Sequence, residues 1–66
     1  MVIELKKQGD GRTRATVREL PEIEVFELDG EAARRRAIFL AGEAVGKAIA
    51  RGEKPVIDLT VSCVIL

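Results

Sequence analysis

Apolar and polar residues alternate in two separate runs near the start of the chain. Residues 2–7 alternate apolar with charged side chains, which is the period of a half-buried strand. Residues 12–19 alternate in the same way, and the Gly-Asp-Gly sequence at residues 9–11 is typical of a tight hairpin turn. The pattern therefore predicts two antiparallel strands joined by this turn.

A third alternating run follows a proline. Pro21 has no N–H to donate to a sheet ladder and holds Leu20 in an extended conformation, so we expect the ladder to break there. Residues 22–28 then resume the strand period. The end of this run falls out of phase with its beginning, which predicts either a bulge near Glu27 or an apolar group on the outer face.

The pattern changes to a helical period after Asp29. This residue is a suitable N-cap, because its carboxylate can accept from N–H groups of the first helical turn. Apolar residues recur three and four positions apart through residues 30–51, and Gly52 suits the position just past a helix end. The stripe is rich in alanine, so we expect the helix to lie close to a sheet. Its members are Ala33, Ala37, Ile38, Leu40, Ala41, Ala44, Val45, Ala48 and Ile49.

The last part of the chain returns to the strand period. Residues 56–66 alternate, and the final residues are apolar on both faces. The order strand, strand, strand, helix, strand predicts a single α+β domain over residues 1–66, in which one helix covers one face of a four-stranded mixed sheet. The other face would carry the charged residues Glu4, Lys6, Arg12, Arg14, Arg18, Glu22, Glu24 and Asp58.

Composition narrows the classes of partner. The chain has 66 residues, of which 47% are apolar and 33% charged, which is typical of one small globular domain with a thin core. Lys plus Arg and Asp plus Glu number 11 each, so no net charge draws the chain toward nucleic acid or an anionic membrane. We expect a cytoplasmic protein with no membrane contact. The near absence of side-chain amides is typical of heat-adapted or designed chains.

Few residues are suited to catalysis. The chain has no His, which removes the commonest general base and metal ligand. The single cysteine, Cys63, is expected to be a small buried apolar residue, since no base is available to activate it. Carboxylates on the charged sheet face lie beside arginines, so we expect cross-strand ion pairs rather than a metal-dependent nuclease site. We therefore expect no catalytic residue, metal or cofactor.

Two features predict self-association. Gly42 and Gly46 lie four residues apart on the helix and weaken it, so they are expected to allow close packing, either on the chain's own sheet or on a partner. The apolar tail is expected to form a sheet edge that pairs with a second copy. The predicted homodimer or larger oligomer would use Val64, Ile65, Leu66, Phe39, Gly42 and Gly46.

Four short motifs occur in an order and spacing typical of one known family. They are Asp-Gly at residues 10–11, Glu-Leu-Pro at 19–21, Asp-Gly-Glu-Ala-Ala at 29–33 and Arg-Gly-Glu-Lys-Pro at 51–55. Over nearly its whole length the chain thus resembles small HicB-like proteins, the antitoxin partners of HicA toxins. The resemblance implies a partial RNase H-like fold with strand order 3-2-1-4 and a last strand parallel to the first, which agrees with the right-handed crossover rule.

Three residues depart from the family pattern. Glu22 stands where the family usually has glycine, Asp29 replaces a capping threonine, and Ala32 replaces a glutamate. The 66 residues also include no counterpart of the C-terminal DNA-binding unit of full-length HicB antitoxins. We therefore expect no direct DNA binding by this chain.

The resemblance implies a non-enzymatic antitoxin that binds a HicA-type ribonuclease toxin and covers its surface. Because HicA toxins are basic, the surface that meets the toxin should be acidic. The candidate residues are Glu19, Glu22, Glu24 and Glu27. Three alternatives stay open: these charges protect a sheet edge from aggregation, the chain is an orphan or designed oligomerisation module, or its arginine face binds nucleic acid.

Overall fold

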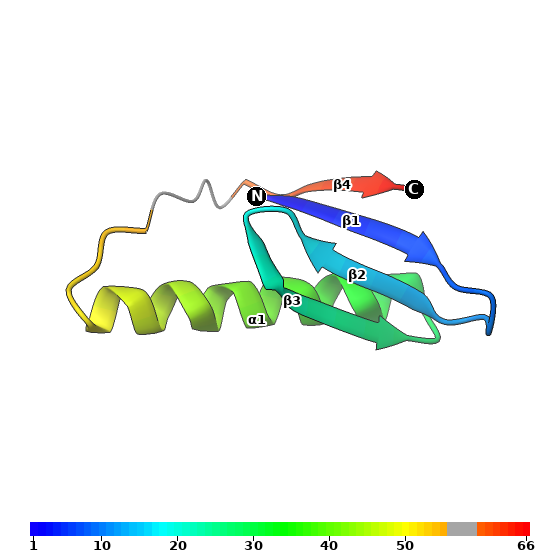
Figure 1. Cartoon of the computed structure of the whole chain (residues 1–66), viewed down its shortest axis with the longest axis horizontal. Coiled ribbons are helices and arrows are strands. Elements are labelled where there is room, and N and C mark those ends of the chain that lie inside the picture. The colour runs from blue at the N-terminus through cyan, green and yellow to red at the C-terminus, as the bar shows by residue number, and fades with distance from the viewer. Residues whose placement is uncertain (56–59) are drawn as a thin grey trace.

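A computed structural model describes residues 1–55 and 60–66, and within them it contains four strands and one helix. Their bounds are β1 Val2–Lys7, β2 Thr13–Val17, β3 Leu20–Glu27, α1 Gly30–Ala50 and β4 Ser62–Ile65. The strands form one sheet of order β3-β2-β1-β4, and α1 lies across one face of it (Figure 1). The predicted α+β class, with one helix on a four-stranded mixed sheet of order 3-2-1-4, is confirmed.

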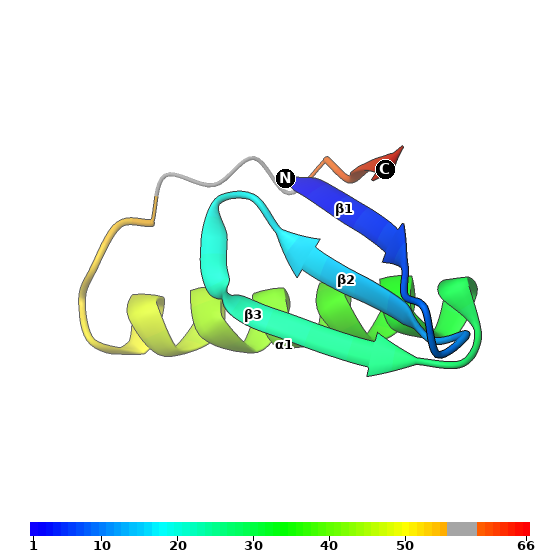
Figure 2. The ribbon, with the colours of Figure 1, turned by 45° about the vertical axis from the view of Figure 1, so that its right-hand side comes forward.

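The sheet combines antiparallel and parallel pairing. The strands β1 and β2 are antiparallel, with Ile3 opposite Val17, and β2 and β3 are antiparallel, with Ala15 opposite Val25. The strand β4 runs parallel to β1, so that Ile3 also lies beside Cys63. Because α1 connects β3 to β4 across one face, β4 is added at the far edge of the sheet, next to β1 (Figure 2).

The hairpin between β1 and β2 closes at the expected turn. The Gln8 N–H donates to the Arg12 carbonyl at 2.7 Å. The Asp10 carboxylate accepts from the Arg12 N–H at 3.0 Å, and this hydrogen bond lowers the pKa of Asp10 from its ordinary value of 3.8. Gly11 has a φ of 92°, a conformation that favours glycine because a side chain would be strained there.

The expected break in the ladder at Pro21 is confirmed, because the pairing shifts between Val17–Leu20 and Thr16–Glu24, but the bounds of the strands differ from the expected ones. The strand begins at Leu20 and includes Pro21, two residues before the expected start, whereas β2 ends at Val17 rather than at Glu19. A proline is tolerated in this position because β3 is an edge strand, where one side of the backbone has no ladder partner. The sequence indicates the break at Pro21, but not that β3 continues across it, because it does not show that β3 is an edge strand.

The end of β3 is out of phase because an apolar side chain lies on the outer face of the sheet, and not because of a bulge near Glu27. The irregularity in strand pairing lies between Thr16 and Val17 of β2, not near Glu27. Phe26 instead lies on the outer face of the sheet, half-buried, with the Arg12 guanidinium 4.7 Å from its ring centre. This cation–π contact shields the ring from water.

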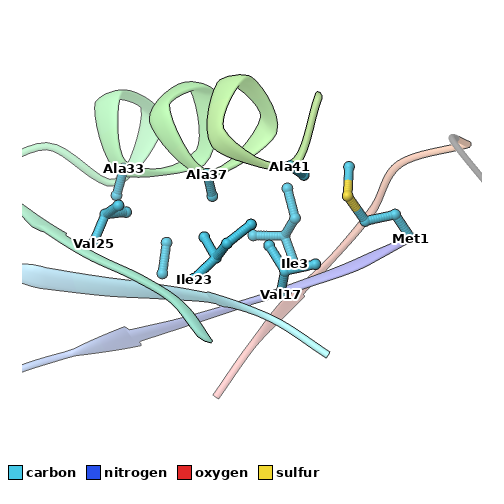
Figure 3. Packing of buried hydrophobic residues seen from close by; sticks show 9 residues of the cluster. Met1, Ile3, Val17, Ile23, Val25, Ala33, Ala37 and Ala41 are labelled. Atoms are coloured by element: carbon cyan, nitrogen blue, oxygen red, sulfur yellow. The ribbon is translucent and has the colours of Figure 1, made fainter. Parts of the chain in front are cut away.

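The core lies between α1 and the sheet. Three alanines, four residues apart on α1, face the strands and allow the helix to approach closely (Figure 3). Ile3 and Val17, from β1 and β2, are the largest fully buried side chains. The buried set consists of Met1, Ile3, Ala15, Val17, Ile23, Val25, Ala33, Ala37 and Ala41. A core this small is what a chain of this length is expected to form.

The ends of α1 agree with the sequence expectation to within one residue. The Asp29 carboxylate accepts from the Glu31 N–H at 3.1 Å, as expected of an N-cap. At the other end, the Gly52 N–H donates to the Ile49 carbonyl at 2.9 Å, with Gly52 at a φ of 81°. Ile49 itself is 60% exposed, so its expected place in the buried stripe is wrong.

Ile49 is exposed because it follows the buried Ala33 by 16 residues, which is about 160° around the helix, and so points away from the sheet. The lengths of the elements expose the end of α1 further. A helix of 21 residues spans about 31 Å, whereas strands of five to eight residues span about 17 to 26 Å. The C-terminal half of α1 therefore extends past the sheet, as both ribbon views show (Figures 1 and 2). This overhang is the reason that part of the apolar stripe has no strand beneath it.

The described part of β4 differs from the expectation in its burial. The strand was expected over residues 56–66, of which residues 56–59, including Asp58, lie outside the described part of the chain. All of residues 60–66 are exposed, and the expected burial of Cys63 is wrong. The reason is that α1 packs mainly on β3 and β2, and less on β1. No helix in the described residues is long and apolar enough to cross a membrane.

Candidate interaction surfaces

The helix-free face of the sheet carries the expected cross-strand ion pairs. The Arg14 guanidinium lies 2.7 Å from Glu24 on the neighbouring strand, and Arg18 lies 3.3 Å from Glu4. These pairs are exposed, so each contributes at most about 1 kcal/mol to stability. Among the described residues, no three acidic, histidine or cysteine side chains gather where they could hold a metal ion.

The arginines of this face have local partners. Arg14 and Arg18 are engaged by the two glutamates, and Arg12 lies 2.7 Å from Asp10 as well as over Phe26. Each guanidinium charge is therefore balanced by a neighbouring carboxylate. An arginine face of this kind offers little unpaired positive charge to a phosphate backbone.

The four candidate acidic residues do not form one patch. Glu22 and Glu24 lie on the outer face of β3, and Glu19 lies in the turn before it. Glu27 points to the opposite side, where it meets Arg36 of α1 at 3.2 Å. The alternation of side chains along β3 separates Glu27 from Glu22 and Glu24. Their role in partner binding stays a prediction.

Three of these four glutamates have partners within the chain. Glu19 accepts from the Val2 N–H at 2.9 Å and lies 3.5 Å from the Met1 amine; the Val2 hydrogen bond is the main cause of its lowered pKa. Glu24 and Glu27 are bound by arginines. Of these four candidates, Glu22 alone forms no ion pair within the described part of the chain, so its charge is the unpaired one.

The outer edge of β4 is a second exposed surface. The inner edge pairs with β1, since the Ser62 N–H donates to the Met1 carbonyl at 3.0 Å and the Leu66 N–H to the Leu5 carbonyl at 2.8 Å. Because alternate residues direct their backbone groups to opposite edges, Cys63 and Ile65 direct theirs away from β1. Within residues 1–55 and 60–66, no strand pairs with this side.

The side chains of this strand are uncharged and largely apolar. Ile65 is 83% exposed and Leu66 63%, and Val64 lies on the helix-free face. No charged residue occurs in residues 60–66. Cys63 lies on the same sheet face as α1, near Arg34, whose pKa is raised mainly by Glu31 and to a smaller extent by the cysteine. The strand thus combines open backbone groups with apolar side chains.

The outer face of α1 is a third exposed surface. Phe39 is 65% exposed, and Ile49 also lies open to solvent. A Cβ added at Gly42 or Gly46 would meet nothing within 4 Å. Of the two expected explanations for these glycines, packing against the chain's own sheet is therefore wrong. Packing of these glycines on a partner stays a prediction.

The sequence interpretation missed a groove beside β3. It is open, has a volume of about 680 Å³, and lies between the start of β3 and the overhanging half of α1. Charged side chains of β3 and α1 also line it, and its apolar lining is Leu20, Ile23, Leu40, Ala44, Ala48 and Pro55. Comparing the helix length with the strand lengths could have indicated it, because a helix longer than its sheet leaves apolar positions without a strand beneath them.

Comparison with known proteins adds no relative. No protein-family model, curated protein or solved structure matches this chain. The likeness to HicB-like proteins therefore depends on the four motifs and their order in the sequence.

Proposed function

We propose that this chain is a non-enzymatic, HicB-like binding protein that associates with itself through β4 and inhibits a basic HicA-type ribonuclease toxin by covering its surface. The observation that carries the proposal is the outer edge of β4, where open backbone groups and uncharged apolar side chains occur together. Such an edge binds another strand readily. Further support comes from the sheet order, which is the order that the resemblance implies.

Self-association follows from the geometry of this edge. Two β4 strands placed antiparallel, with Val64 on the two-fold axis, bring Cys63 of one copy opposite Ile65 of the other. Both residues direct their backbone groups outward, so they form a hydrogen-bonded pair. The contact covers the exposed side chains of Ile65 and Leu66 and continues one sheet through two copies. It also adds apolar burial that the thin core of one chain lacks.

Toxin inhibition rests on buried area more than on charge. Glu22 is the candidate whose charge is unpaired in the described residues, and it can steer a basic partner toward the β3 side of the molecule. Since the other candidate glutamates are engaged within the chain, affinity must come from contact surface. The groove beside Glu22, lined by Leu20 and Leu40, offers such a surface.

Co-expression tests the antitoxin role. A small basic protein encoded beside this chain should be toxic alone, and this chain should restore growth and purify with it. Glu22→Lys should weaken the complex, while Glu31→Lys, a charge reversal at an exposed residue in the first turn of α1 and outside the groove, should leave it intact. Failure to rescue growth, or an equal effect of both variants, would contradict the proposed role.

An oligomerisation module with no toxin is the second candidate. It is favoured by the pairing of Glu19, Glu24 and Glu27 within the chain, which leaves little acidic surface for a basic partner. Light scattering should then give a multiple of 7.2 kDa, while co-expression gives no rescue. A mass of 7.2 kDa at high protein concentration would contradict self-association in either form.

A further inference from the structure

The outer face of α1 carries two large apolar side chains with two glycines between them. Gly42 and Gly46 follow the buried Ala33 and Ala37 by nine residues, which is about two and a half helical turns. They therefore lie on the side of α1 opposite the sheet. Phe39 lies near them, 65% exposed.

The isolated chain gains nothing from these glycines. Glycine in a helix interior is less favourable than alanine, because it loses more backbone freedom on folding. Neither Gly42 nor Gly46 has a close neighbour that would exclude a Cβ, and neither has a positive φ. Their presence, next to an exposed Phe39, fits a helix that another helix approaches closely.

We infer that this face is a contact between two copies of the chain, with the two α1 helices antiparallel and the two-fold axis near residue 44. The spacing is self-complementary. Phe39 and Ile49 each lie five residues from position 44, and Gly42 and Gly46 each lie two residues from it. An antiparallel pair therefore places Phe39 of one copy opposite Ile49 of the other, and Gly42 opposite Gly46.

Charge complementarity favours a second copy as the partner of this face and favours an antiparallel arrangement of the two helices. Glu43 and Lys47 flank the face, are exposed, and form no ion pair within residues 1–55 and 60–66. In the antiparallel pair, Glu43 of one copy lies within one helical turn of Lys47 of the other, twice by symmetry. A parallel pair would instead place these residues of the two copies on opposite sides of the contact, where they do not meet, and would align the two helix dipoles unfavourably.

This contact is independent of the β4 edge and of any toxin. Both contacts are isologous, so each joins two copies through the same surface. A chain with two such surfaces assembles beyond a dimer, as a closed tetramer or as a longer array. Blocking one surface should therefore leave dimers held by the other.

Light scattering on paired variants tests the contact. Ile65→Pro removes an outward N–H and should disable the β4 edge, leaving a dimer of twice 7.2 kDa. Adding Phe39→Glu should convert this dimer to monomer. Adding Leu28→Glu, at a side chain that is 81% exposed and lies outside both surfaces, should leave the dimer intact. A monomer before Phe39→Glu is added, or a dimer after it, would overturn the inference.

Disulfide trapping tests the direction of the helices without weakening the apolar contact. Gly42→Cys and Gly46→Cys chains, each with Cys63→Ser, are oxidised alone and as a mixture. The antiparallel pair predicts that the mixed disulfide forms faster than either self-linked one. Faster self-linking would show a parallel pair, and no cross-link in any sample would show that this face meets something other than a second copy; either result overturns the inference. Circular dichroism on each variant confirms that the chain is folded.

Discussion

The two edges of the sheet are built in opposite ways. The β3 edge carries Pro21, which cannot donate to an added strand, and the charged residues Glu22 and Glu24. The β4 edge carries no charge and no proline in residues 60–66, and its side chains are largely apolar. Proline and charge are the usual means by which an edge strand resists pairing with another chain. The chain thus protects one edge and leaves the other open to a partner.

This difference also determines where a second copy can attach. Pairing of β4 with β3 of another copy would repeat without closing, and would produce an open array. The features of β3 oppose that pairing, while β4 against β4 closes as a symmetric dimer. The protected edge therefore limits growth, and the open edge provides association. Changing residues at each edge tests this division.

The largest effect should come from comparing two isoleucines on the same sheet face. Ile3 on β1 is fully buried, whereas Ile65 on neighbouring β4 is 83% exposed. We expect Ile3→Ala to lower the free energy of unfolding by about 2–5 kcal/mol, because it leaves a cavity beneath α1. Ile65→Ala, measured at a dilution where the chain is monomeric, should change it by less than about 0.5 kcal/mol. Urea denaturation gives both values, and equal losses would show that β4 is buried within one chain.

The next effect concerns association through β4. In a Phe39→Glu background, where the α1 contact is disabled, we expect Ile65→Lys, which adds a charge to β4, to weaken self-association by about 30-fold, the equivalent of losing a contact of about 2 kcal/mol. Sedimentation equilibrium over a dilution series measures the change. Lys6→Ala, a change on the paired strand β1, serves as the control and should leave the dissociation constant unaltered. Unchanged association of Ile65→Lys would mean that β4 is not the interface.

A smaller effect should follow from removing the protection of β3. We expect the double variant Glu22→Val with Glu24→Val to change monomer stability by no more than about 1 kcal/mol, because exposed ion pairs contribute little. Its solubility should fall, and thioflavin fluorescence should rise on storage, as an unprotected edge meets the open β4 of other copies. Lys6→Val with Lys7→Val, at two exposed positions on the interior strand β1, is the control. Equal solubility of the two double variants would show that charge on β3 has no protective role.

Much of the fold could be predicted from local periodicity. The alternation in residues 2–7 and the capping chemistry of Asp29 depend only on neighbouring positions, and both agree with the structure. The start of β3 and the burial of Cys63 were misjudged for a shared reason. Whether a strand is central or at an edge, and whether a helix covers it, depends on how distant elements pack. The period of a strand states which face a residue lies on, not what covers that face.

The candidate surfaces were harder to predict than the fold. Glu27 and Arg36 are nine residues apart and Glu4 and Arg18 are 14 apart, so their pairing depends on the sheet register and the helix orientation. A row of glutamates in the sequence therefore suggested a patch that the fold divides. The exposed β4 edge was easier to predict, because the absence of charged residues from residues 60–66 can be read directly from the sequence.

The smallest effect concerns Glu19, which links the turn before β3 to the start of β1. Its carboxylate accepts from the Val2 N–H, and this lowers the pKa of Glu19 below its ordinary value of 4.5. A carboxylate with a lowered folded-state pKa contributes stability above its unfolded pKa, and that contribution is lost as the pH falls through the folded value. We therefore expect thermal stability to decline below about pH 4.5, and Glu19→Gln to decline less steeply than the parent chain. Glu22→Gln, at a nearby glutamate of β3 without an ion pair in the described residues, should follow the parent curve. If thermal stability declines with falling pH equally steeply in both variants, the hydrogen bond from Val2 to Glu19 does not stabilise the fold.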